Sequence, residues 1–503
     1  MISLRRPWSR FAPLAPVILL SAVLGGGLVI AFDMGSKWIA LTTMAYLAAA
    51  FGVVFKDKRL FAVCLAAACV PIGFQYNLWT HGGKFTFLNH FGGALAEPVI
   101  YLVDIPIALL ALIWVADLRL GVVTLPRWSR MDTLLVSLIG AFLFSLYNTE
   151  EYFLFAFEVL RYLKYLAFYW MLRTYLVRPD FYWGILAVNI ALLSIQGLVS
   201  LMQYFFLFQF PIPVGGVSGT DFDVVDNEII QRVTGILGHS NTFAAYLTVG
   251  CSICLIVLFA RVRTLYKLAV LPMLLAGLIS MVFTFSRNGW MVLAFETIGL
   301  SYWALRTKRL QAGHILFIGG ACAGLFGLLL VTGVFDTMLT RIFRTNSGAF
   351  DSRGDLLQVA LEMIQAQPLI GIGLNSFEEN MIHFDPNHIT HIIRQPVHNG
   401  FLLVAAETGI PALLILLAVL AGYVRMSWAI LRKDNELQFA VGLTGLVTFA
   451  GLGIANLFDV TLRKESIAGT IVVVAAMVAG LFDLDLRGKP SGEGRAAGSA
   501  GSP

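Results

Sequence analysis

The chain has 503 residues, of which 58% are hydrophobic and 13% are charged, and its mean hydropathy is +0.80. A soluble domain usually carries about 25% charged residues, so this chain cannot cover itself with a surface that faces water. The formal net charge of +5 is small for this length. The basic residues lie in short clusters between apolar runs, a pattern typical of membrane orientation and not of nucleic-acid binding. The composition therefore predicts an all-α, polytopic integral membrane protein that lies in a lipid bilayer and binds no nucleic acid.

Apolar runs recur along the whole chain, and many reach the roughly 20 residues that a helix needs to cross a bilayer. By this criterion we count about fourteen candidate transmembrane helices. Their approximate centres are Leu20, Met44, Ala67, Leu109, Leu138, Tyr165, Leu193, Thr248, Leu275, Ala294, Gly324, Leu416, Thr448 and Val474.

Basic clusters alternate along the chain, and lysine and arginine favour the short loops on the cytoplasmic side. An N-terminus inside the cell assigns to the cytoplasm the clusters Arg5/Arg6/Arg10, Lys56/Lys58/Arg59, Arg119/Arg127/Arg130, Arg173/Arg178, Arg261/Arg263/Lys267, Arg306/Lys308/Arg309, Arg432/Lys433 and Arg487/Lys489. The opposite loops are poorer in basic residues, apart from Lys37, Lys84, Arg463 and Lys464. We therefore expect both ends inside, spans 1–11 within residues 1–332, spans 12–14 within 398–484, and a disordered cytoplasmic tail at 485–503.

Two polar intervals fall on the outer side in this arrangement: a small periplasmic loop at 209–238 and a large one at 333–397. In the large loop, the sequence predicts a short amphipathic helix that Ser352 caps and that ends near Gln365. Its apolar face is formed by Leu356, Val359, Ala360 and Met363. Gly371 and Gly373 allow a tight turn after it. We expect this helix to lie over the outer ends of the transmembrane helices.

Three ionisable residues lie inside one predicted span, where charge is costly and usually marks a cavity or a partner. Glu158, Arg161 and Lys164 are spaced by three residues, so they share nearly one face of that helix. Two interpretations stay open: Glu158 pairs with Arg161 to hold helices together, or the cations belong to a binding site.

Two further stretches bring polar residues to the outer surface. Arg287 lies where one predicted span ends outside and the next begins, and an outer arginine runs against the basic bias, which favours a site over a topology anchor. Arg232 and His239 lie where the small loop returns to the membrane, with Asn241 predicted to cap the next helix. His239 by itself fits a structural polar contact, whereas Arg232 suggests a binding role.

The outer surface thus gathers Arg232, Arg287, Arg353 and His398. Arginine binds phosphate oxygens through two hydrogen bonds and stays charged when it is partly desolvated. Histidine can accept a proton from an attacking hydroxyl near neutral pH. This combination predicts transfer of a group from a lipid phosphate or diphosphate to an acceptor alcohol. The general base stays open among three residues: His398, Glu407 and Glu378.

The loop histidines His383, His388 and His391 raise the alternative of a metal site. Their stretch lacks the helical pair of histidines four residues apart, with a general base, that many catalytic zinc sites use. We therefore interpret these histidines as solvated loop residues, and we predict neither a metal nor another cofactor.

Several short motifs carry a resemblance to a known family. They are Arg232-Val-Thr-Gly235, His239-Ser-Asn241, Thr284-Phe-Ser-Arg-Asn-Gly-Trp290, Ser352-Arg-Gly354, Pro368-Leu-Ile-Gly-Ile-Gly-Leu-Asn-Ser-Phe377 and the stretch from His398 to Pro411. In this order, around one large outer loop, the chain resembles the O-antigen ligase and O-antigen polymerase-like membrane glycosyltransferases.

The resemblance implies a metal-independent enzyme of the bacterial inner membrane that takes a glycan from undecaprenyl diphosphate to an acceptor hydroxyl at the periplasmic face. Such enzymes build lipopolysaccharide or exopolysaccharide. It implies that Arg232 and Arg287 hold the diphosphate and that His398 acts near the acceptor. Further candidates are Arg353, Arg161 and Lys164 for the diphosphate, Arg287 and Glu407 for catalysis, and His239, Asn241, Asn375 and Asn399 as supporting residues.

The motifs do not separate the branches of this family. Ligation onto a lipid core, chain polymerisation and transfer onto protein all stay open, with a glycan or lipid acceptor and other polysaccharide-assembly proteins as candidate partners. A polysaccharide flippase is the competing class of function. Transporters tend to have repeated halves and midplane sites, whereas the polar residues here gather at one face.

Overall fold

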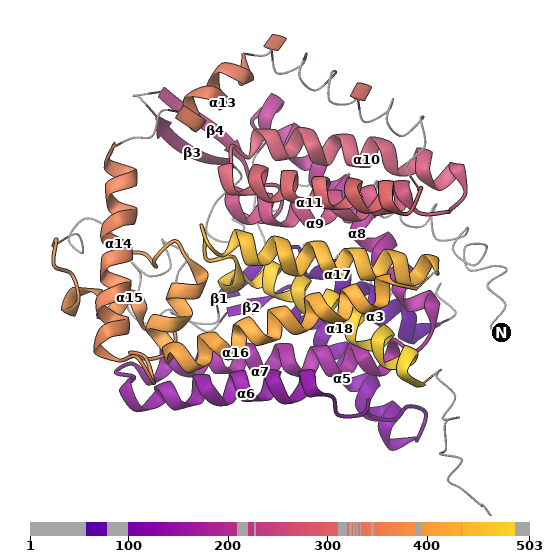
Figure 1. The fold of residues 1–503 in the computed structure, drawn as a ribbon, viewed down its shortest axis with the longest axis horizontal. Coiled ribbons are helices and arrows are strands. Elements are labelled where there is room, and N and C mark those ends of the chain that lie inside the picture. Colours follow the sequence, from indigo (N-terminus) through magenta and orange to yellow (C-terminus); the bar gives the residue numbers. More distant parts are fainter. Residues whose placement is uncertain are drawn as a thin grey trace, which may run out of the picture.

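The computed structural model describes residues 57–77, 99–208, 220–225, 228–309, 333–343, 347–388, 394–433 and 435–487, with a few residues between 319 and 331. This part of the chain is mostly helical, and its long helices lie side by side with similar directions (Figure 1). Seven of the described helices are long and apolar enough to cross a membrane. They are α6 (Arg130–Phe144, continued by η2, Ser145–Asn148), α8 (Pro179–Phe206), α9 (Ser240–Phe259), α10 (Thr264–Phe283), α16 (Gly400–Leu431), α17 (Glu436–Ala455) and α18 (Glu465–Arg487). The prediction of a helical membrane protein is confirmed.

Four other helices carry predicted span centres: α3 (Lys58–Cys69), α5 (Asp104–Arg119), α7 (Tyr152–Tyr175) and α11 (Arg287–Arg306). With 12 and 16 residues, α3 and α5 are shorter than the roughly 30 Å hydrocarbon core requires at about 1.5 Å per residue. The predicted centres at Leu20 and Met44, and the tail beyond Arg487, lie outside the described residues, and the region around Gly324 is described only in part. The count of about fourteen spans therefore stays a prediction.

Basic residues from separate clusters meet at one end of the helical bundle. Arg178 binds Asp57, beside the cluster at Lys58, with 2.8 Å between Nη1 and Oδ2. Arg309 binds Glu436, a few residues from the cluster at Lys433, also at 2.8 Å. Basic clusters that are far apart in the sequence thus lie at the same end of the bundle. The side of the membrane that this end faces stays a prediction.

The other end of the bundle, which we call the loop face, carries the segments between the long helices. There α14 (Ser347–Ala366) runs across the helix ends, with α13 (Val334–Phe343), α15 (Phe377–Asn380) and η3 (Met381–His383) in the same region (Figure 1). The predicted apolar face of α14 is confirmed, since Leu356, Val359, Ala360 and Met363 are fully buried. The predicted start is wrong: α14 begins at Ser347, so Ser352 lies inside the helix, where it cannot act as an N-cap.

Two small antiparallel hairpins add strand to a fold predicted to be all helical. The pair of β1 (Gln75–Asn77) and β2 (Val99–Tyr101) is short. The pair of β3 (Thr220–Val225) and β4 (Glu228–Val233) occupies the end of the small predicted loop, with Asp221 opposite Arg232. Along β4, Ile230 and Arg232 are buried whereas Ile229 is exposed, so strand alternation turns the Arg232 side chain toward the bundle.

The large loop is fixed to a break in α16. Gly409 has a positive φ of 84°, which interrupts the helix there. Ile372 N and Gly373 N donate to the carbonyls of Ala406 and Glu407, each at 3.0 Å. The predicted tight turn is confirmed, because φ is +76° at Gly371 and +119° at Gly373. A Cβ at Gly371 would lie 2.3 Å from the Glu407 carbonyl carbon, so only glycine allows this close approach.

Candidate functional site

The polar residues of the loop face form two neighbouring groups. The first, the His398 group, surrounds the starts of α9, α11, α16 and α18 and consists of Arg232, His239, Asn241, Arg287, His398, Asp459 and Lys464. The second, the Arg463 network, lies beside it and consists of Glu158, Arg161, Asn375, Glu378, Glu407 and Arg463.

Helix N-termini converge at the His398 group. Asn288, in the first turn of α11, donates its side-chain amide to Ala455 O at the end of α17 (3.1 Å). Gly400 N, at the start of α16, donates to Asn456 O just beyond α17 (2.8 Å). The backbone N–H groups at a helix start carry partial positive charge, which favours an anion nearby. The starts of several helices thus lie at one region, together with the C-terminal end of α17, whose carbonyls accept these two hydrogen bonds.

Arg232 is held by the helix that follows it and by the turn that precedes α11. Its Nε donates to Thr284 O at 2.8 Å, and its Nη2 donates to Asn241 Oδ1 at 2.7 Å. Asn241 was predicted to cap α9, but the N-cap is His239, whose Nδ1 accepts from Asn241 N at 3.2 Å. Asn241 is already helical, so its side chain is left to orient Arg232.

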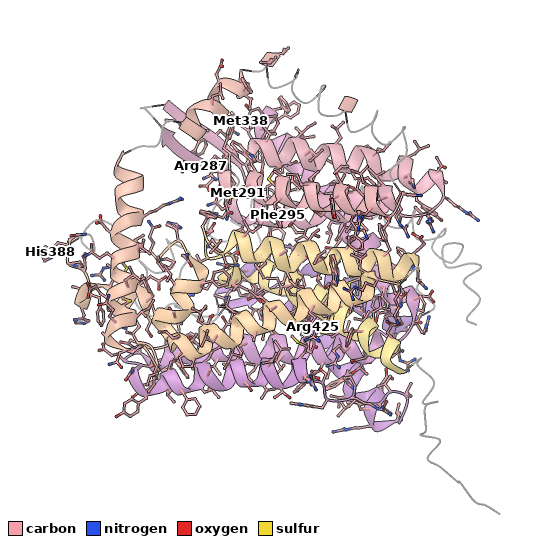
Figure 2. The ribbon with its side chains drawn as sticks, viewed as in Figure 1. Arg287, Met291, Phe295, Met338, His388 and Arg425 are labelled. Atoms are coloured by element: carbon pink, nitrogen blue, oxygen red, sulfur yellow. The ribbon has the colours of Figure 1, made fainter. Side chains whose placement is uncertain are left out.

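Arg287 is the first residue of α11. It follows a tight turn in which the buried Phe285 adopts a left-handed φ of 48°. Its side chain is exposed, at the loop-face end of the helix along which Met291 and Phe295 follow (Figure 2). Because Arg232 binds the same turn through Thr284 O, the two predicted diphosphate binders are brought to one place.

His398 lies beside a carboxylate that the sequence analysis did not single out. Its Nδ1 is 4.0 Å from Oδ1 of Asp459, on the connection between α17 and α18. Burial raises the pKa of Asp459, but the neighbouring His398 and the Lys464 ammonium outweigh burial and hold that pKa at about 2. Asp459 is therefore ionised at neutral pH and can stabilise a proton on His398.

The second histidine of the group, His239, is neutral at neutral pH. His239 is exposed at the surface, but the protein packed around its ring and the Lys464 ammonium lower its pKa to about 4. The imidazole is accordingly neutral at neutral pH, with the proton on Nε2 because Nδ1 accepts the cap hydrogen bond. His239 can then offer an N–H donor but no positive charge.

The charge balance of the His398 group favours an anion. Arg232, Arg287 and Lys464 are cationic, and two carboxylates accompany them: Asp459 and Asp221, which accepts from Ser240 Oγ at 2.9 Å. The side chains therefore leave a net positive charge, to which the helix starts add.

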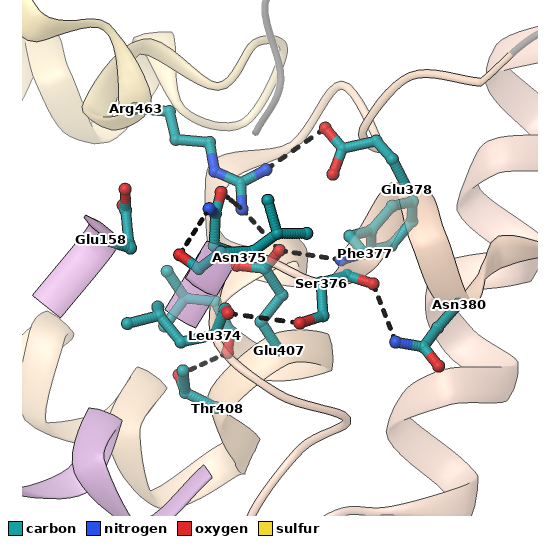
Figure 3. A network of polar contacts seen from close by, with 12 residues as sticks. Glu158, Leu374, Asn375, Ser376, Phe377, Glu378, Asn380, Glu407, Thr408 and Arg463 are labelled. Atoms are coloured by element: carbon teal, nitrogen blue, oxygen red, sulfur yellow. Dashed lines mark hydrogen bonds and ion pairs between the residues drawn. The ribbon is translucent and has the colours of Figure 1, made fainter. Parts of the chain in front are cut away.

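The Arg463 network is buried. Arg463 Nη2 lies 2.5 Å from Glu407 Oε1, and its Nη1 lies 3.4 Å from Glu378 Oε1 (Figure 3). Glu407 Oε1 also accepts from Phe377 N at 3.1 Å. Asn375 accepts from Arg463 at 3.4 Å and donates to Leu154 O at 2.8 Å. The predicted catalytic candidate Glu407 thus binds an arginine and the backbone of the loop.

The charged residues of α7 are paired. Of the two interpretations left open, the ion pair between Glu158 and Arg161 is present, and Arg161 Nη1 also donates to Arg463 O at 2.5 Å. Lys164 Nζ lies 2.8 Å from Asp104 Oδ1 and 2.5 Å from Glu465 Oε1.

The remaining predicted residues lie at the edges of the site or away from it. Asn399 is the N-cap of α16, and its Oδ1 accepts from Phe401 N and Leu402 N, each at 3.0 Å. Arg353 lies exposed on α14. His388 projects on the outer side of α14 (Figure 2), and His391 lies outside the described residues. Among the residues that the structure describes, three or more histidine, cysteine or acidic side chains nowhere gather in a way that could hold a metal ion.

A small cavity with a mixed, mainly apolar lining adjoins the His398 group, between α9, α11, α17 and α18. It has a volume of about 30 Å³, enough for one or two water molecules, and Asn241, Asn288 and Thr461 contribute to its wall. Glu296 also lines the cavity and accepts from Ser252 Oγ at 2.6 Å. The sequence analysis missed this buried carboxyl, although its position inside an apolar run was a signal.

Residues 272–417 match the family model for O-antigen ligase. This segment is similar to O-antigen ligase. The resemblance seen in the sequence is confirmed for this segment, which contains Arg287, Arg353, His398 and Glu407. No curated protein matches the chain. Arg232 and Asp459 lie outside the matched residues, and the fold brings them to that segment.

Proposed function

We propose that this O-antigen ligase-like protein transfers a glycan from undecaprenyl diphosphate to an acceptor hydroxyl during the synthesis of cell-surface polysaccharide. In this proposal it spans the bacterial inner membrane many times, with both termini in the cytoplasm and the loop face in the periplasm. The observation that carries the proposal is the His398 group. There an anion-favouring cluster of cations and helix starts adjoins a histidine with a carboxylate partner.

The proposed reaction is a substitution at the anomeric carbon of the donor sugar. The acceptor oxygen forms a bond to that carbon while the bond from the carbon to the phosphate oxygen breaks. His398 takes the proton of the acceptor hydroxyl, and the Asp459 carboxylate stabilises the imidazolium that forms. The departing diphosphate keeps the electron pair of the broken bond, and Arg232 and Arg287 stabilise its charge.

We assign the other candidates to supporting roles, according to their partners. Arg161, Lys164 and Glu407 each contact groups of opposite charge within the fold, so their charges serve the framework. Asn241 orients Arg232, and His239 and Asn399 shape the starts of α9 and α16. Arg353 stays a candidate for contact with the donor from α14.

A reconstitution with defined substrates tests this proposal. Purified protein in liposomes receives a polyprenyl-diphosphate glycan and, in separate reactions, a lipid acceptor, a glycan acceptor or a protein acceptor. Mass spectrometry then identifies the product. We expect release of polyprenyl diphosphate together with a glycosylated acceptor, and the acceptor that reacts distinguishes a ligase from a polymerase or a transferase onto protein.

Variants connect the activity to the site. We expect His398→Ala to abolish transfer and Arg287→Ala to lower it through a raised KM for the donor. Arg425→Ala should retain transfer, because Arg425 is exposed on α16 and lies far from Arg287 (Figure 2). Movement of intact lipid-linked glycan across the liposome membrane without bond cleavage would instead identify a transporter.

A further inference from the structure

Arg463 connects segments that lie far apart in the sequence. Its guanidinium contacts Glu407 on α16, Glu378 on α15 and Asn375 in the turn before α15 (Figure 3). The arginine side chain is 5% exposed, and the two glutamate side chains are 4% and 2% exposed. A single buried cation therefore joins the large loop to α16.

The backbone around Arg463 belongs to the connection that carries Asp459. This connection is also attached to the start of α16, where Gly400 N contacts both Asn456 O (2.8 Å) and Asp459 O (3.2 Å). The Asn399 side chain donates to Leu457 O at 3.3 Å. His398 and Asp459 thus lie on two segments joined near Gly400, and Arg463 joins the same two segments again at Glu407.

The charges of the network make Arg463 hard to replace. The three carboxylates Glu158, Glu378 and Glu407 share two guanidinium groups, from Arg161 and Arg463. Glu158 Oε2 and Glu378 Oε2 are buried and make no hydrogen bond within the described part of the chain. Buried carboxylates without a cation are strongly unfavourable, so loss of Arg463 weakens the attachment of the loop turn to the connection, although backbone hydrogen bonds still hold each of them to α16.

We propose that Arg463 is a positioning residue for glycan transfer. It holds the loop turn at 375–378 and the connection at 456–464 in a fixed relative position, and it thereby keeps Asp459 beside His398. This inference rests on the proposed function. Arg463 itself acts through Asp459 and has no direct contact with the reacting atoms.

The main test replaces Arg463 by lysine, which keeps the charge but lacks the planar fork that binds two acceptors. A displacement of about 1 Å at a reacting group can cost up to roughly 100-fold in rate. We therefore expect Arg463→Lys to lower kcat at least about 10-fold, while the KM for the donor changes less than about 3-fold because Arg232 and Arg287 keep their partners.

The chain offers a matched control at the opposite end of the bundle. Arg173 is also buried and bridges two carboxylates, Asp132 and Asp483, each at 2.5 Å. Arg173→Lys should lower thermal stability to a similar degree and leave kcat unchanged. If Arg463→Lys behaves in the same way as this control, Arg463 is merely structural and the proposal is overturned.

Hydrogen exchange measured by mass spectrometry tests the coupling without any substrate. We expect Arg463→Lys to accelerate exchange in peptides from both 369–380 and 456–464, and Arg173→Lys to accelerate neither. Faster exchange in only one of the two segments would overturn the proposal. A wild-type protein that transfers no glycan would refute the proposed function instead, because the exchange result does not depend on activity.

Glu378→Gln serves as a second variant if Arg463→Lys does not fold. It removes one of the contacts of Arg463 and keeps the contact with Glu407. We expect faster exchange at 369–380 and a fall in kcat smaller than that of an Arg463 substitution. An unchanged kcat in a folded Glu378→Gln protein whose loop exchanges faster would overturn the link between the loop and the reaction.

Discussion

Asp459→Asn is the sharpest test of the proposed chemistry. The carboxylate oxygen lies 4.0 Å from His398 Nδ1, and it also accepts from Val460 N at 2.7 Å. Asparagine keeps the shape and can keep the backbone hydrogen bond, so the substitution removes little except the negative charge. The proposal requires that charge, since His398 becomes positive when it takes the acceptor proton.

The pKa of Asp459 sets the expected size of the effect. His398 and Lys464 hold that pKa at about 2, against an ordinary value of 3.8, even though burial acts in the opposite direction. A difference of this size corresponds to about 2 kcal/mol in favour of the ionised carboxylate. If most of this energy stabilises the His398 imidazolium in the transition state, loss of the Asp459 charge lowers kcat by roughly 30-fold.

The assay is the reconstituted transfer reaction, followed by release of polyprenyl diphosphate at saturating donor and acceptor. Asp355→Asn is the matched control, because Asp355 lies on α14 and accepts from the Asn387 side chain, outside the His398 group. Asp459→Asn should lower kcat with little change in the donor KM. A folded Asp459→Asn protein whose kcat stays within about 3-fold of wild type would refute the role given to this pair.

Four further outcomes follow from the site and its framework. Arg287→Ala should raise the donor KM by about 10- to 100-fold and weaken the salt dependence of donor binding, because a charged hydrogen bond contributes about 1.5–3 kcal/mol. Gly371→Ala should destabilise the protein by about 3 kcal/mol or more in a thermal unfolding assay, since its Cβ would meet the Glu407 backbone at 2.3 Å. The pKa of His239 is lowered to about 4, so its contribution to stability is complete above pH 6.5 and is lost as pH falls toward 4, a dependence that His239→Gln should remove in thermal unfolding. EDTA should leave the transfer rate unchanged, in line with the metal-independent chemistry that we predict.

Local pattern was enough to predict several elements. The buried face of α14 follows from apolar residues that recur at helical spacing, and the loop turn follows from two glycines that adopt positive φ. Arg232 and Arg287 could be brought together from topology alone, because both adjoin helix starts on the same side. The hairpin of β3 and β4 was not predicted, since its strands are short and β4 places an arginine on its buried face.

The Arg463 network depends on contacts that local pattern does not encode. Arg463 meets Glu407 and Glu378 across 56 and 85 residues of chain. In the sequence, Glu407 resembles a catalytic group, because an isolated carboxylate in an apolar run is costly and suggests a function. Only the fold supplies the arginine partner that satisfies the charge.

One signal in the sequence nevertheless applies equally to three basic residues of the loop face, Arg287, Arg463 and Lys464. Arg287 is a site candidate because an outer arginine opposes the orientation bias, and Arg463 and Lys464 oppose the same bias. The orientation bias does not favour a cation on that side, so its presence there indicates a partner of opposite charge. The partner is Glu407 for Arg463 and Asp459 for Lys464. Applied to all three residues, the rule marks the connection that contains Arg463 and Lys464, and the fold then places Asp459 of this connection beside His398.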